Sequence, residues 1–152
     1  MQPEVKFFAV SSWEEKLHHI CQTSEQWVAS GERVLIWVAN PDQAKRLDGV
    51  LWQGERTQFL PHAVWPCALR VHPIVLSWQP LQLPVPHHLI VAHPHEPSSA
   101  ELFSWMKTFL SVHEYADSSQ PSLQQQSRQR FRVWKQHGGS PAFVKNQGNS
   151  VQ

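Results

Sequence analysis

Residues 33–39, RVLIWVA, limit most strongly what this chain can fold into. A continuous run of β-branched and large apolar residues, without polar alternation, is typical of a strand that is covered on both faces. A second such run, HLIVAH, occupies residues 88–93, and further strand candidates lie at residues 5–10 and 74–78. Strands covered on both faces occur mainly in parallel sheets with helices on either side.

Four segments with helical periodicity separate and follow these strands. The first opens with a capping box, in which Ser12 is followed three positions later by Glu15. The second has Asn40 as N-cap and Pro41 at the first helical position. The helices are expected at residues 11–31, 40–54, 98–110 and 121–138.

Strands that alternate with helices predict an α/β fold, a three-layer Rossmann-like domain with a mostly parallel central sheet. A chain of 152 residues suffices for one such domain. We expect the domain to occupy residues 1–138. Residues 139–152 contain few apolar side chains and are predicted to form a flexible C-terminal tail.

The cysteines and the apolar runs indicate the compartment. Cys21 and Cys67 are isolated and form no CxxC pair, so neither a disulfide framework nor a zinc knuckle is indicated. The N-terminus lacks the pattern of a signal peptide. The longest apolar runs are too short to cross a bilayer. A soluble, cytoplasmic protein is the expectation.

The pattern of an α/β enzyme is missing from the sequence. The first strand leads into SSWEE, which resembles neither G-x-G-x-x-G nor a P-loop, so no nucleotide-binding loop is expected. The group His88, His93 and His95 has no acid or cysteine at a matching spacing, so ordinary histidines are favoured over a metal site. We predict no catalytic residues, no metal and no cofactor.

Charge is distributed unevenly along the chain. Residues 1–117 contain eight Lys or Arg and twelve Asp or Glu, whereas residues 118–152 contain five Lys or Arg and no acid. The net charge of the whole chain is only +1. Such asymmetry indicates a local basic surface that meets an anionic partner.

The last helix carries this basic surface. At 100° per residue, Arg128, Arg132 and Lys135 fall within about 60° of one another. Phe131 flanks this stripe on the side of Leu123 and Trp134, which are predicted to anchor the helix to the core. A solvated helix face is the alternative explanation. The absence of acids and the neighbouring aromatic favour a site for an anion that also carries an apolar group.

Four stretches together resemble the chi subunit of bacterial DNA polymerase III. They are SGERVLIWV (30–38), DQAKRLDGVLW (42–52), QFLPH (58–62) and SLQQQSRQRFRVWKQHG (122–138). The resemblance covers about residues 5–138. It implies a Rossmann-like fold without a nucleotide site. It also implies two partners: the psi subunit, which connects chi to the clamp loader, and the acidic C-terminal tail of single-stranded DNA-binding protein, which ends in phenylalanine.

The resemblance also assigns the residues that grip this tail. Position 131 is often tyrosine in the family and is phenylalanine here, which keeps the apolar wall and loses a hydroxyl. Ala116 is a weaker candidate. The tail-binding residues are expected to be Trp52, Phe59, Arg128, Phe131, Arg132 and Lys135.

We therefore expect a non-catalytic accessory subunit of the DNA polymerase III holoenzyme. It would link the clamp loader, through psi, to single-stranded DNA-binding protein during DNA replication, and would contact DNA only indirectly. One alternative is a module that binds nucleic acid directly through the basic C-terminal helix. A less favoured alternative is a divergent nucleotide-using α/β enzyme.

Overall fold

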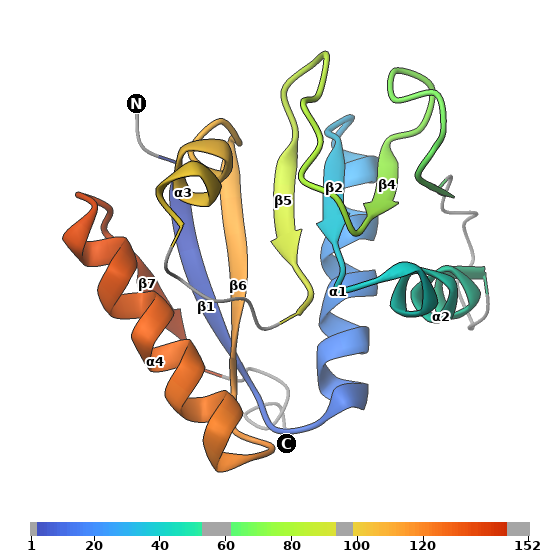
Figure 1. Cartoon of the computed structure of the whole chain (residues 1–152). Coiled ribbons are helices and arrows are strands. Elements are labelled where there is room, and N and C mark those ends of the chain that lie inside the picture. The colour runs from blue at the N-terminus through green and yellow to red at the C-terminus, as the bar shows by residue number, and fades with distance from the viewer. Residues whose placement is uncertain (1–2, 53–61, 94–98, 146–152) are drawn as a thin grey trace.

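The computed structural model describes residues 3–52, 62–93 and 99–145. Seven strands form one sheet in the order β3-β4-β2-β5-β6-β1-β7, and every pair of neighbours is parallel. The strands are β1 (Glu4–Val10), β2 (Val34–Trp37), β3 (His62–Val64), β4 (Ile74–Ser77), β5 (His88–Val91), β6 (Ser111–Asp117) and β7 (Ala142–Val144). The helices are α1 (Trp13–Ala29), α2 (Pro41–Trp52), α3 (Ala100–Met106) and α4 (Pro121–Gln136). The predicted α/β fold with a parallel sheet is confirmed (Figure 1).

The two faces of the sheet carry two separate cores. On β2, Leu35 and Trp37 contribute to the core beneath α3 and α4, whereas Val34 and Ile36 contribute to the core beneath α1 and α2. All four side chains are buried because the strand is covered on both faces. The continuous apolar run in the sequence is thus explained.

The helix starts follow the predicted capping chemistry. The backbone N–H of Glu15 donates to Ser12 Oγ at 3.1 Å, and that of Gln43 donates to Asn40 Oδ1 at 2.8 Å. Gly31, just beyond the end of α1, has a φ of +75°, a left-handed conformation that costs glycine little. Local sequence therefore sets where α1 and α2 begin and where α1 ends.

The helical spacing of apolar residues predicts that Trp13 and Leu110 face the core, yet both lie at the surface. Trp13 is 39% exposed because it occupies the first turn of α1, beyond the end of β1. Leu110 is 49% exposed. The reason is that α3 ends at Met106, so the helical spacing that assigned Leu110 to the core no longer applies there.

Three strands were not predicted from the sequence, and β6 is the most important of them. Its sequence, SVHEYAD, has no continuous apolar run, yet its first five residues are buried and it lies between β5 and β1. The polar side chains of β6 do not predict a buried strand, because the partners that allow their burial lie elsewhere in the sequence. Glu114, for example, pairs with Arg130 of α4.

The strand β7 lies in the segment that was predicted to be a flexible tail. Ala142–Val144 pairs with β1 at the sheet edge, so the expectation of a loose tail from residue 139 onward does not hold for these three residues. Main-chain pairing orders this segment without apolar burial, since Ala142 and Phe143 are both exposed. Residues 146–152 lie outside the described part of the chain. None of the helices in the described ranges has the length and apolar character that a membrane span requires.

A basic groove between the last helix and the sheet edge

The helix α4 is oriented by a stripe of three buried residues. Ser127, Arg130 and Trp134 are at most 3% exposed, and at 100° per residue they fall within about 60° of one another. Trp134 was predicted to anchor the helix, and it is fully buried in the core. Arg130 is also buried, at 3% exposed.

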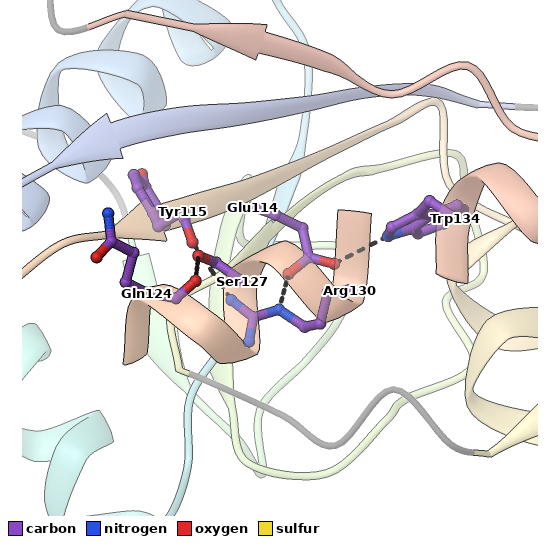
Figure 2. A network of polar contacts seen from close by, with 6 residues as sticks. All are labelled: Glu114, Tyr115, Gln124, Ser127, Arg130 and Trp134. Carbon is purple, nitrogen blue, oxygen red and sulfur yellow. Dashed lines mark hydrogen bonds and ion pairs between the residues drawn. The ribbon is translucent and has the colours of Figure 1, made fainter. Parts of the chain in front are cut away.

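A carboxylate on β6 explains how an arginine can be buried. Glu114 Oε1 accepts a hydrogen bond from Arg130 Nε and Glu114 Oε2 accepts one from Trp134 Nε1, each at 2.9 Å (Figure 2). Arg130 Nη2 also donates to the main-chain oxygen of Tyr115 at 3.3 Å. We call Glu114, Arg130 and Trp134 the Glu114 network. It joins α4 to the sheet and leaves the other face of the helix free.

An open groove lies between that free face and the edge of the sheet. Its volume is about 860 Å³, and residues of β1, β6, β7 and α4 line it. We call it the α4 groove. Its lining residues are Phe7, Ala9, Ala116, Ser118, Gln124, Gln125, Ser127, Arg128, Phe131, Arg132 and Phe143.

Aromatic rings form the apolar part of the α4 groove. Phe131 packs edge-on against Phe7 of β1, with 5.2 Å between the ring centroids. Phe143 of β7 is 54% exposed, which is unusual for so large an apolar side chain. An apolar ligand group would cover these rings and remove their surface from water.

Cationic groups form the other part. Arg128 and Arg132 line the groove and are exposed to solvent. The Nζ atom of Lys135 lies 5.3 Å from the centroid of the Phe131 ring, over its face. The groove therefore offers two guanidinium groups beside an apolar floor, and a third cation at its rim.

The structure brings together most of the residues that the sequence selected. Arg128, Phe131 and Arg132 line one groove, and Ala116, the weaker candidate, lines it as well. Lys135 is connected to the groove through Phe131.

Trp52 lies elsewhere in the molecule. It ends α2, which packs against β3 and β4, while α4 packs against β6 on the opposite face of the sheet (Figure 1). From β4 to β6 is three strand positions, or about 14 Å at the usual strand spacing. The side chain of Trp52 and the whole of Phe59 lie outside the described residues.

Sequence reasoning missed the part of the groove that the sheet supplies. Phe7 and Ala9 occupy alternate positions of β1 and therefore share a face, but nothing local places them beside α4. Phe143 was missed because its segment was predicted to be a tail. The alternation of side chains along β1 predicts that Phe7 and Ala9 face α4, but only once β6 and β7 are known to flank β1.

A hydrogen-bonded chain elsewhere has the composition of a catalytic triad. His88 Nδ1 lies 2.6 Å from Ser111 Oγ, and His88 Nε2 lies 2.7 Å from Glu32 Oε1. Ser111 is only 6% exposed, and the chain lies at the amino ends of β5 and β6, whereas open α/β sheets bind ligands at the carboxyl ends. We regard it as structural. Within the described ranges, no cluster of three His, Cys, Asp or Glu is arranged to hold a metal ion, and His95 lies outside them.

Comparison with known proteins identifies the family. A model of the family DNA polymerase III chi subunit, HolC, matches residues 2–142, which is nearly the whole chain. The chain belongs to the DNA polymerase III chi subunit family. It is thereby a member of a family of accessory subunits of a replicative DNA polymerase. Among curated protein sequences, no significant match was found.

Solved structures share the fold at low sequence identity. T4 UvsW is 9% identical with a TM-score of 0.67, and the match covers 95% of this chain and 41% of that one. The C-terminal domain of a variant of S. cerevisiae Dbp5, solved in complex with Gle1 and IP6, is 10% identical with a TM-score of 0.62, and the match covers 99% and 93%. The chain thus spans about two fifths of the UvsW structure. At these identities the likeness concerns the fold alone.

Proposed function

We propose that this chi-family protein is a non-catalytic linker in the DNA polymerase III holoenzyme. On this proposal it binds the psi subunit, and through psi the clamp loader, while the α4 groove holds the acidic C-terminal tail of single-stranded DNA-binding protein. Family membership supports the assignment to the holoenzyme. The resemblance of the sequence to chi proteins supports the two partners.

The α4 groove is the single observation that carries the tail-binding part. Arg128 and Arg132 line it together with Phe7, Phe131 and Phe143. A peptide that ends in phenylalanine presents a ring and a carboxylate on the same residue, and both have a matching partner in this groove. Acidic residues earlier in the peptide would be attracted by the same cations over a longer range.

The expected affinity follows from the groups involved. Burial of a phenylalanine ring contributes about 1.5–3 kcal/mol. A charge-assisted hydrogen bond between Arg and a carboxylate contributes about 1.5–3 kcal/mol. Ordering a flexible peptide opposes both contributions. These two contacts supply about 3–6 kcal/mol, so a micromolar Kd, which corresponds to about −8 kcal/mol, also requires contacts from the acidic residues of the peptide.

We restrict the proposed tail site to residues in or beside the α4 groove, apart from one candidate of the resemblance. We place the terminal residue of the tail among Arg128, Phe131 and Arg132, with Ala116 in the floor and Lys135 at the rim. Trp52 ends a helix on the opposite face of the sheet, so we remove it from the site. Phe59 stays a candidate from the resemblance alone.

Synthetic peptides test the proposal directly. We expect an acidic peptide that ends in Pro-Phe to bind with a micromolar Kd by isothermal titration calorimetry. The same peptide without its last Phe should not bind measurably, and a C-terminal amide should weaken binding at least fivefold because it removes the carboxylate. Equal binding of the shortened peptide would refute the assignment of the groove.

Direct nucleic-acid binding is the rival that the exposed cations of α4 leave open. Because both kinds of binding weaken in salt, salt dependence does not separate them. A competition experiment separates them. With a fluorescent acidic peptide bound at saturating concentration, a single-stranded oligonucleotide should fail to displace it. Displacement, together with oligonucleotide binding that Arg128→Ala abolishes, would favour the rival.

A further inference from the structure

Glu114 presents a problem in the physics of the fold. Its side chain is 0% exposed, on β6, the strand against which α4 packs. A carboxylate withdrawn from water is costly unless charged and hydrogen-bonding partners surround it. The pairing of Glu114 with Arg130 and Trp134 offsets that cost, but an apolar trio of similar volume would fill the same space without it.

The Glu114 network adds a constraint on how α4 is rotated about its own axis. Arg130 and Trp134 are four residues apart, so they contact the two oxygens of one carboxylate from successive turns of α4. Arg130 also donates to the main chain of Tyr115, the next residue on β6. Hydrogen bonds depend on angle as well as distance, whereas apolar contacts tolerate rotation. The helix is therefore held at one rotation about its axis.

That rotation decides where the cations lie. At 100° per residue, Arg128 and Arg132 are each about 160° from Arg130, on the opposite side of the helix. With Arg130 held on the sheet, both guanidinium groups are exposed at the groove, and Phe131, between the two sides, meets Phe7. A modest rotation of α4 would separate Phe131 from Phe7 and turn one arginine away.

We propose that Glu114 is a positioning residue for peptide binding: through Arg130 and Trp134 it fixes the rotation of α4 and so assembles the α4 groove. This inference rests on the proposed function. Glu114 does not itself line the groove, so it acts on the peptide only through the helix.

The test compares three variants of the full chain. E114M/R130M replaces the buried ion pair by apolar side chains of similar length and leaves Arg128, Phe131 and Arg132 in place. E114Q keeps the size of the side chain but sets an amide against the Arg130 donors. Leu47→Ala, in the core beneath α2, is the control that lowers stability without touching α4.

Two quantities are measured well below each melting temperature: the Kd for the acidic peptide ending in Pro-Phe, and hydrogen exchange of α4 by mass spectrometry. E114M/R130M should lose at least fivefold in affinity and E114Q less, while Leu47→Ala binds within twofold of the original protein. Unchanged affinity in E114M/R130M would overturn the inference, and so would an equal loss in Leu47→Ala.

Hydrogen exchange keeps the inference separate from the proposed function. If the original protein does not bind the peptide at all, the proposed function fails and exchange decides the role of Glu114. Faster exchange across residues 121–136 in E114M/R130M, with α1 unchanged, would then show that Glu114 positions α4. Exchange equal to that of the original protein would show that it does not.

Discussion

Arg128 and Arg130 are two residues apart and have opposite roles. Arg130 is 3% exposed and pairs with Glu114, while Arg128 is exposed and lines the α4 groove. Their positions differ by about 160° around the helix axis, which places them on opposite sides of the helix. The same residue type is thus structural at one position and available to a ligand at the other.

Arg128→Ala should therefore weaken binding of the acidic peptide by tenfold or more, because a guanidinium partner of its carboxylate is lost. The melting temperature should stay within about two degrees, as is usual for an exposed side chain. Calorimetric titration and thermal unfolding measure the two effects. The matched control is Arg46→Ala, an exposed arginine on α2, and affinity lost equally in both variants would contradict the role of Arg128.

Lys16 is a second residue whose surroundings set its behaviour. It is 5% exposed, and its Nζ lies over the rings of Trp13 and Tyr115 at 5.9 and 5.4 Å from their centroids. Burial lowers its pKa from 10.5 to about 8, against the opposing influence of Asp117. The folded state therefore holds this proton less tightly than the unfolded chain does.

Lys16→Met should raise the free energy of unfolding at pH 7 by about 1–3 kcal/mol, since it keeps the apolar stem and removes a buried charge. Between pH 8 and 10.5 the unfolded chain binds the lysine proton and the folded protein releases it, so the original protein gains stability as pH rises. The advantage of the variant should shrink across this window in urea titrations. A constant difference in free energy of unfolding between the two proteins from pH 7 to 10.5 would show that Lys16 does not cause the pH dependence.

At the scale of elements, β7 shows how an edge strand can complete a site. It adds three residues to the open side of β1, and Phe143 in its centre is 54% exposed where it lines the groove. This exposed ring lies beside Arg128 and Arg132, so a ligand with an apolar group and an anionic group can cover the ring and contact the cations. A role in ligand contact gives a reason for the exposure of this ring.

Phe143→Ala should lower peptide affinity about three- to tenfold, from the loss of part of an apolar contact worth about 1 kcal/mol. Stability should change by no more than about 0.5 kcal/mol, because the ring is mostly in water. Peptide titration and chemical unfolding measure these effects. Val71→Ala, 68% exposed and distant from β7 in the sheet order, serves as the control. Full affinity in Phe143→Ala would exclude β7 from the site.

At the scale of the whole molecule, the side of the sheet beneath α1 carries two neighbouring imidazoles, of which His113 is buried and His19 half-buried. His19 Nδ1 lies 2.8 Å from the Tyr115 hydroxyl, and the His113 ring lies 4.7 Å, between centroids, from the rings of Phe8 and Trp27. Burial lowers the pKa of His19 to about 4 and that of His113 to about 3. Neighbouring His19, Lys6 and His88 lower the pKa of His113 further.

Both histidines therefore make the protein sensitive to acid. Below pH 6.5 the unfolded chain binds their protons and the folded protein does not, so stability falls as pH decreases from 6.5 toward 4. His113→Leu should reduce the loss between pH 7 and 4.5 by about 2 kcal/mol in urea titrations. If variant and original protein lose stability in parallel, His113 is not the source.

The sequence predicted most elements whose signals are local. The capping groups of Ser12 and Asn40 and the apolar run of β2 depend on neighbours within a few residues, and the structure confirms each. It missed β6, because Glu114 looks unsuitable for a buried strand until its partner sixteen residues later is known. The sequence also failed to predict β7, because main-chain pairing with β1 orders this strand although its side chains bury little apolar surface.

For the candidate site, the sequence alone determined the basic stripe on the last helix, because helical geometry follows from spacing. Only the tertiary structure decided what faces that stripe. Parallel pairing places β1 between β6 and β7, and so brings Phe7, Ala116 and Phe143 to one surface from distant parts of the chain. The same topology places Trp52 on the other face. The faces of a helix follow from residues three and four positions apart. Adjacent strands of a parallel sheet are joined by crossovers of many residues, so local sequence patterns do not predict which strands are neighbours.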